Sequence, residues 1–249
     1  MKVLLTGFDP FGGESVNPAF EAIKLLPDTI AGAEIVKVEI PTEFTRSISC
    51  VEAAIKEHNP DVVINVGQAG GRACVTVEKV GINLADARIP DNAGEQPSDE
   101  PLQADGPTAY FATIPVKAMV QNVREHGLPC HVSFTAGTYV CNCVMYNVLH
   151  LCATKYPNIR AGFIHVPFAC EQVVGKASTM ASKHHGKHAA GNDCKISGIL
   201  HRGSRNQQRR SRRSNGNYPL KQTFRPSYRN FGAAVCFFCY FLFCKLYLL

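Results

Sequence analysis

The stretch from His131 to Cys152 constrains the fold most, because it combines a strand, a turn and a helix in one run. His131 to Phe134 predict a short apolar strand, and Gly137 allows a tight turn after it. Apolar residues then recur at helical spacing, at Cys141, Val144, Met145, Val148, Leu149 and Cys152. The pattern therefore places Cys141 in the first turn of a helix that follows a strand.

Two interpretations of Cys141 follow from this position. The unpaired N–H groups and the dipole at a helix N-terminus favour an anion, so they can lower a thiol pKa toward neutrality and can hold an oxyanion. The alternative is a buried small apolar side chain, which is the usual fate of a free cysteine. A nucleophilic role would also require a histidine nearby.

Strand-like and helical segments alternate along the first 170 residues. Strands are expected at 3–5, 34–40, 62–66, 131–134 and 161–166, and helices at 17–26, 43–57, 107–126 and from 141 onward. Extended structure is also expected between Cys74 and Ile89, and a long surface loop at 90–107. This alternation predicts an α/β fold with a mainly parallel sheet and helices on both faces.

Several chemically distinctive residues come directly after expected strands. They are the loop with Phe8 and Phe11, the turn 67–72, Cys141 and His165. Because parallel strands place their carboxyl ends on one edge of the sheet, these residues can converge there. The alternative for the two phenylalanines is a place in the core. The glycine-rich loop after the first strand has neither the Gly-Lys-Ser/Thr of a phosphate-binding P-loop nor the Gly-x-Gly-x-x-Gly of a dinucleotide-binding loop.

The residue types permit a cysteine-based catalytic triad. Such a triad needs a thiol, a histidine that receives its proton, and a polar group that orients the imidazole. Cys141 and His165 lie on successive strands in this interpretation, so they can be neighbours, and Glu78 is available for the third role. The alternatives are a structural core histidine and a half-exposed structural carboxylate, since ionised side chains are seldom buried unpaired.

Long motifs distributed over residues 1–175 carry a family resemblance. They are Thr6–Gly13, Gly67–Arg72, Glu78–Asn83, Asp86–Asn92, Ala104–Pro107, Thr135–Asn142 and Phe163–Phe168. In this order they resemble the pyrrolidone-carboxylate peptidases, cysteine peptidases that are also called pyroglutamyl peptidase I. The resemblance implies a three-layer α/β/α sandwich with a mainly parallel twisted sheet, a cytoplasmic homotetramer, and no cofactor or metal. It implies removal of an N-terminal 5-oxoproline from peptides through a thioacyl-enzyme.

The resemblance also assigns roles to individual residues. The family's catalytic cysteine, histidine and glutamate fall on Cys141, His165 and Glu78. The implied substrate-binding residues are Phe8, Phe11, Gln68, Arg88, Ile89, Tyr139 and Val140. Pyroglutamate carries no charged amine, because its nitrogen is closed into a lactam, so apolar walls with a few hydrogen bonds suit the ring.

Cys143 departs from the family pattern, since many members have histidine there. It creates a Cys-x-Cys pair with Cys141, one residue short of the spacing of a zinc site, and no second cysteine pair follows with metal spacing. The seven cysteines of residues 1–176 lie in an otherwise ordinary globular composition, and no apolar leader precedes Thr6. These features favour a reducing, cytoplasmic setting.

Charge divides the chain into an expected catalytic domain, 1–176, and an atypical tail, 177–249. The first part has 13 Lys and Arg against 19 Asp and Glu, a net −6, whereas the second has 13 against 1, a net +12. Residues 179–214 are basic without apolar periodicity, which is typical of disorder. The final apolar run, within 231–249, is shorter than the ~20 residues of a spanning helix and would serve at most as a tail anchor.

Alternative functions follow from this tail. It could tether the peptidase to a membrane through 231–249, or the chain could be an inactive α/β scaffold whose basic segment binds nucleic acid or anionic membrane. A solvated basic tail without a partner is the simpler interpretation, and nucleic-acid binding is the less expected one. The abrupt change in composition also suggests a shifted reading frame or an alternative final exon.

Overall fold

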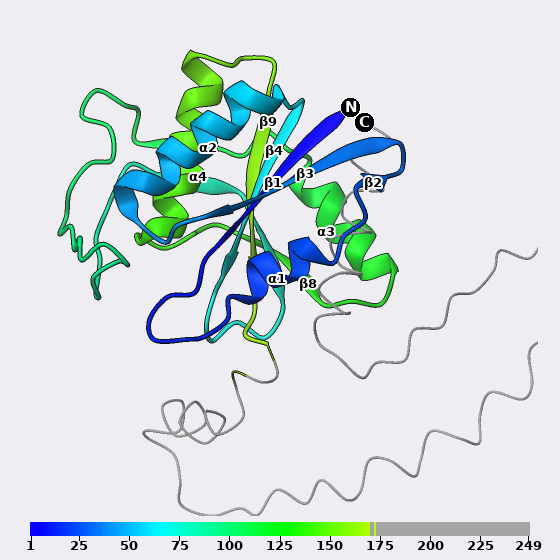
Figure 1. The fold of residues 1–249 in the computed structure, drawn as a ribbon, viewed down its shortest axis with the longest axis horizontal. Coiled ribbons are helices and arrows are strands. Elements are labelled where there is room, and N and C mark those ends of the chain that lie inside the picture. Colours follow the sequence, from blue (N-terminus) through cyan, green and yellow to red (C-terminus); the bar gives the residue numbers. More distant parts are fainter. Residues whose placement is uncertain (170–171, 173–249) are drawn as a thin grey trace, which may run out of the picture. The chain divides into compact units, whose positions relative to one another are not determined.

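The computed structural model describes residues 1–169 and 172 (Figure 1). Their elements are β1 (Lys2–Phe8), α1 (Pro18–Lys24), β2 (Thr29–Ile30), β3 (Ala33–Ile40), α2 (Phe44–His58), β4 (Val62–Gln68), β5 (Val75–Glu78), β6 (Val80–Ile82), β7 (Ala109–Phe111), α3 (Val116–Glu125), β8 (Cys130–Ser133), α4 (Val140–Thr154) and β9 (Arg160–Val166). The predicted helices and strands are thus largely present. The expected long loop is confirmed between β6 and β7.

Seven strands form one mainly parallel sheet in the order β2-β3-β1-β4-β9-β5-β8. The pairs β1–β3, β1–β4, β4–β9 and β5–β8 are parallel, whereas β2–β3 and β5–β9 are antiparallel. Figure 1 shows α2 and α4 packed together on one side of this sheet and α1 and α3 on the other. The predicted three-layer α/β/α sandwich is therefore confirmed.

Local sequence signals explain where the first helices begin and end. The side chain of Asn17 accepts a hydrogen bond from the N–H of Ala19 at 3.1 Å, and Pro18 starts α1 with its fixed φ. Asn59 closes α2 in the left-handed conformation, with φ of 46°. These caps set the point at which the chain returns to the sheet.

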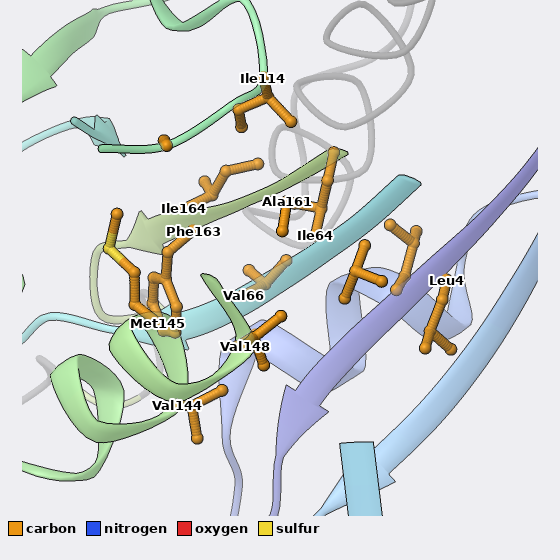
Figure 2. Packing of buried hydrophobic residues seen from close by; sticks show 14 of the residues in the cluster. Leu4, Ile64, Val66, Ile114, Val144, Met145, Val148, Ala161, Phe163 and Ile164 are labelled. Carbon is orange, nitrogen blue, oxygen red and sulfur yellow. The ribbon is translucent and has the colours of Figure 1, made fainter. Parts of the chain in front are cut away.

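The core lies on both faces of the central strands. The side chains of β1 and β4 are almost wholly buried, as expected for strands covered by helices on both sides. Figure 2 shows Met145 of α4 beside Phe163 of β9, while Ile114 lies on the side of β9 to which Ile164 points. Successive residues of a strand point to opposite faces, so β9 contributes to both halves of the core.

One part of the sequence-based fold was wrong. The helix expected at 107–126 begins only at Val116, because 109–111 form β7, paired with β6, and Pro115 disfavours a helical residue before it. The strand before Cys141 and the strand of His165 are successive along the chain, as expected, but β5 lies between β8 and β9 in the sheet. The sheet is mainly parallel, as predicted, with β5 running against β9.

The predictions for the tail 177–249, including its basic segment and its apolar end, lie outside the described residues. Within the part that the structure describes, no helix is both long enough and apolar enough to cross a membrane.

Candidate active site

A cavity of about 330 Å³ opens where β1, β4 and β9 end. It is lined by Phe8, Phe11, Asn17, Thr42, Gln68, Ala69, Gly70, Arg72, Arg88, Thr135, Ala136, Gly137, Tyr139, Cys141 and His165. The predicted convergence of strand ends is therefore confirmed. A larger cavity of about 620 Å³, between α2, α4 and residues 95–103, contains neither Cys141 nor His165 in its lining.

Helix α4 carries Cys141 onto the face of the sheet that holds His165. The sulfur lies directly over Gly67, since a Cβ placed on that glycine would meet Sγ at 2.8 Å. Gly67 is paired with His165 across the parallel β4–β9 ladder, and paired residues project on the same face. The thiol and the imidazole therefore occupy adjacent positions, although their strands are not neighbours. The described residues show no hydrogen bond between them, and such bonds often tighten only when substrate is bound.

Glu78 holds the other side of the imidazole. Its Oε1 lies 2.8 Å from Nδ1 of His165, and both side chains are buried, at 0% and 3% exposure. The alternative of a half-exposed carboxylate is wrong, because β5 lies inside the sheet with β9 on one side and β8 on the other. Three of the expected components, Cys141, His165 and Glu78, are thus brought together.

The electrostatics of this group set its resting protonation. Burial raises the pKa of Glu78, but His165, Ser133 and Arg72 outweigh burial and hold that pKa below its usual value. Burial also lowers the pKa of His165, which Glu78 only partly offsets. At neutral pH the imidazole is therefore neutral. Because the ionised carboxylate can only accept, Nδ1 carries the hydrogen and Nε2 is free to take a proton.

The thiol is protonated at rest. Burial raises the pKa of Cys141 to about 12, the negative charge of Glu78 adds to this, and Arg72 opposes it. The interpretation in which the helix N-terminus lowers the thiol pKa is therefore wrong, because burial and the neighbouring carboxylate raise that pKa. The arrangement supports attack by a thiol that transfers its proton to His165, rather than a preformed thiolate–imidazolium pair.

The expected substrate-binding residues separate into two groups. Phe8, Phe11, Gln68, Arg88 and Tyr139 line the cavity, where the rings of Phe11 and Tyr139 lie 6.3 Å apart. Ile89 is 48% exposed and Val140 is fully buried in the core, and neither belongs to the lining.

Cys143 points away from this site. It is buried, lines the larger cavity, and places its sulfur 3.5 Å from the carbonyl oxygen of Phe44. Among the described residues no group of three or more His, Cys, Asp or Glu side chains is arranged to hold a metal ion.

Comparison with known proteins decides the family. Residues 1–200 match the family model described as pyroglutamyl peptidase. The chain is 66% identical over 176 residues to the pyrrolidone-carboxylate peptidase of Enterococcus faecalis. This aligned stretch covers 71% of this chain and 83% of that protein. The chain belongs to the pyroglutamyl peptidase family.

Other pyroglutamyl peptidases agree with this assignment. The Levilactobacillus brevis pyrrolidone-carboxylate peptidase is 60% identical over 177 residues, 71% of this chain and 87% of that protein. The crystal structure of Bacillus amyloliquefaciens pyroglutamyl peptidase I gives a TM-score of 0.68 at 47% identity, covering 70% of this chain and 85% of the other. The structure of a mutant pyrrolidone carboxyl peptidase from Pyrococcus furiosus gives a TM-score of 0.68 at 43% identity, covering 72% of this chain and 86% of the other.

Within this pyroglutamyl peptidase fold, two residues next to the site were missed from sequence. Gly67 leaves the space that the Cys141 sulfur occupies. Arg72 forms an ion pair with Glu78. The signal for both was the glycine-rich stretch 67–72, which begins within the last residues of β4, but the reach of an arginine side chain cannot be read from sequence.

Proposed function

We propose that this protein hydrolyses the bond that follows an N-terminal pyroglutamyl residue, with Cys141 as the nucleophile. One observation supports this most strongly. The Cys141 sulfur lies beside His165, whose other nitrogen is held by the buried Glu78 at 2.8 Å, and both open into a cavity with aromatic walls. This is the combination of nucleophile, base and orienting group that acyl transfer requires.

The cavity suits a neutral ring. Phe8, Phe11 and Tyr139 supply apolar walls for the flat lactam. The side-chain oxygen of Gln68 accepts a hydrogen bond from Gln172 at 3.0 Å, so its amide N–H groups are the part that can donate to the lactam carbonyl. Arg88 is exposed and lines the cavity from the segment after β6.

The reaction follows from the resting protonation. The Cys141 sulfur attacks the pyroglutamyl carbonyl carbon as its proton passes to Nε2 of His165, and the C=O electrons move onto oxygen. Backbone N–H groups of the first turn of α4 are unpaired within the helix and stabilise this oxyanion, an effect of about 3 kcal/mol per donor in other enzymes.

The second half of the reaction reverses these roles. Collapse of the tetrahedral intermediate breaks the C–N bond, and the leaving amine takes the proton from His165. His165 then removes a proton from water, whose oxygen attacks the thioester. Pyroglutamate leaves and the thiol of Cys141 is restored. Glu78 keeps the imidazole in one tautomer throughout.

Turnover of a fluorogenic pyroglutamyl amide by the full chain under reducing conditions tests this proposal. We expect hydrolysis of the pyroglutamyl amide, no hydrolysis of the matched prolyl amide, and no turnover by Cys141→Ala. The proposal fails if folded, monodisperse protein gives no turnover, or if Cys141→Ala is as active as the unaltered chain.

Residues 1–176 would form the catalytic domain, and the cytoplasm would be the compartment. The residues that line the cavity lie between Phe8 and His165, and the cysteines at 50, 74, 130, 141, 143 and 152 are free thiols, which suits a reducing setting. A homotetramer is proposed on the family resemblance. Light scattering of the full chain tests the assembly, and fractionation of cells tests the compartment.

A further inference from the structure

We propose that Arg72 is a positioning residue, which holds Glu78 against His165 and joins it to the segment that carries Cys141. This inference deepens the proposed function and rests on it. Arg72 lies at the end of the turn after β4, and its side chain is 26% exposed, between the cavity and the buried carboxylate.

The guanidinium joins separate parts of the site. One terminal nitrogen donates to Oε1 of Glu78 at 2.5 Å and to the hydroxyl of Thr76, both on β5. The other terminal nitrogen donates to the carbonyl oxygen of Thr135 at 2.9 Å. Thr135 begins the turn that leads to Cys141, so the fork of one arginine fixes the carboxylate relative to that turn. A lysine has a single nitrogen and cannot reproduce this geometry.

The choice of carboxylate oxygen matters for the imidazole. Oε1 of Glu78 accepts hydrogen bonds from Arg72, from His165 and, at 3.3 Å, from Thr76. Oε2 has no hydrogen-bond partner among the described residues. Arg72 therefore anchors the same oxygen that orients Nδ1. Without Arg72 the carboxylate would keep only Thr76 and His165 on this oxygen, so its position, and with it the direction of Nε2 toward the thiol, would be less firmly fixed.

The positive charge has a second effect. The charged and titratable groups that act on His165 are Glu78 and Arg72, and those that act on Cys141 are Glu78, Arg72 and Cys143. Arg72 lowers the pKa of both His165 and Cys141, which opposes the effect of Glu78. Because His165 must be neutral to accept the thiol proton, Arg72 extends the active range toward lower pH.

Three single variants of the full chain test the proposal in steady-state kinetics. Arg72→Gln removes the charge but keeps a hydrogen-bond donor, and Arg72→Lys keeps the charge but loses the fork. Arg46→Gln is the matched control, since Arg46 is 70% exposed and pairs with Glu43 outside the cavity lining.

We expect Arg72→Gln to lower kcat about 100-fold, with KM changed less than about threefold, since misorientation acts on the chemical step. Its acid limb of kcat/KM should move to higher pH. Arg72→Lys should keep the acid limb of the unaltered chain while kcat still falls about 10-fold. Arg46→Gln should match the unaltered chain. A raised KM with an unmoved acid limb in Arg72→Gln would show a substrate contact instead, and unchanged kcat would show no role; either result overturns the proposal.

A titration of His165 by NMR gives a readout that needs no turnover. The titration uses folded Cys141→Ser protein, and the His165 signal is assigned by its absence in a His165→Asn variant. The pKa of His165 should be higher in the Cys141→Ser, Arg72→Gln double variant than in Cys141→Ser alone. An unchanged or lowered pKa overturns the electrostatic part of the proposal. If the unaltered chain shows no turnover, the proposed function fails by itself, and this titration still decides the electrostatic effect of Arg72 on His165.

Discussion

Replacing Gly67 with alanine should displace the nucleophile without changing the chemical identity of any group that reacts. The added Cβ would lie 2.8 Å from Sγ of Cys141 and 2.9 Å from Cζ of Phe163. Ordinary van der Waals contacts of a Cβ are 3.4–4 Å, so the sulfur has to retreat by about 1 Å. Phe163 is fully buried and packs against His165, at 4.8 Å between ring centroids, so it cannot yield freely.

The magnitude follows from the sensitivity of acyl transfer to geometry. A displacement of 1 Å can cost about 100-fold in rate, which corresponds to about 2.7 kcal/mol in the activation free energy. Overpacking of a core position also costs about 1–3 kcal/mol in the free energy of unfolding. Gly67→Ala should therefore fold less stably and lose about 100-fold in kcat, with a smaller change in KM.

The assay combines kcat for a pyroglutamyl amide with urea unfolding of the same preparation. Gly162→Ala is the matched control, because its Cβ would meet the end of the Ile114 side chain at 2.2 Å, and neither residue lines the cavity. It should lose stability and keep kcat. If Gly67→Ala is folded and retains kcat within about threefold, the position assigned to the sulfur is refuted.

Three further predictions test the protonation and the roles of neighbouring residues. Burial lowers the pKa of His165 from 6.5, so the acid limb of kcat/KM should have its midpoint below pH 6.5; a midpoint above it would contradict the neutral resting pair. Glu78→Gln should lower kcat by at least about 100-fold and shift the His165 titration to lower pH, because the charge of Arg72 is then unopposed; an upward shift would contradict this electrostatic account. Cys143→Ala should keep kcat and lose about 1 kcal/mol of unfolding free energy, and loss of activity in stably folded protein would show that the second thiol takes part.

Much of the site could be predicted from the sequence, because strand ends in an α/β sheet meet at one edge. Phe8, Phe11, Cys141 and His165 each follow or end a strand, and all four line one cavity. Residue type made Glu78 available for the third role and the family motifs assigned that role to it, which the 2.8 Å contact with His165 matches in geometry.

The remainder depends on tertiary packing that no local pattern reports. Glu78 is fully buried only because β5 inserts between β9 and β8, an order that reverses one strand direction. The thiol lies beside the imidazole because α4 places the Cys141 sulfur over Gly67, which is paired with His165, and not because two strands are neighbours. Burial then reverses the expected direction of the Cys141 pKa.

The central claim is that Cys141 carries the pyroglutamyl group during turnover. Acid quenching of the full chain during hydrolysis of an activated pyroglutamyl ester, followed by peptide mass spectrometry, tests it directly. We expect one added pyroglutamyl group on the peptide that contains Cys141, sensitive to hydroxylamine and missing in Cys141→Ala. A label on another residue would contradict the account. So would turnover that leaves the Cys141 peptide unlabelled under conditions where acylation is faster than hydrolysis of the thioester.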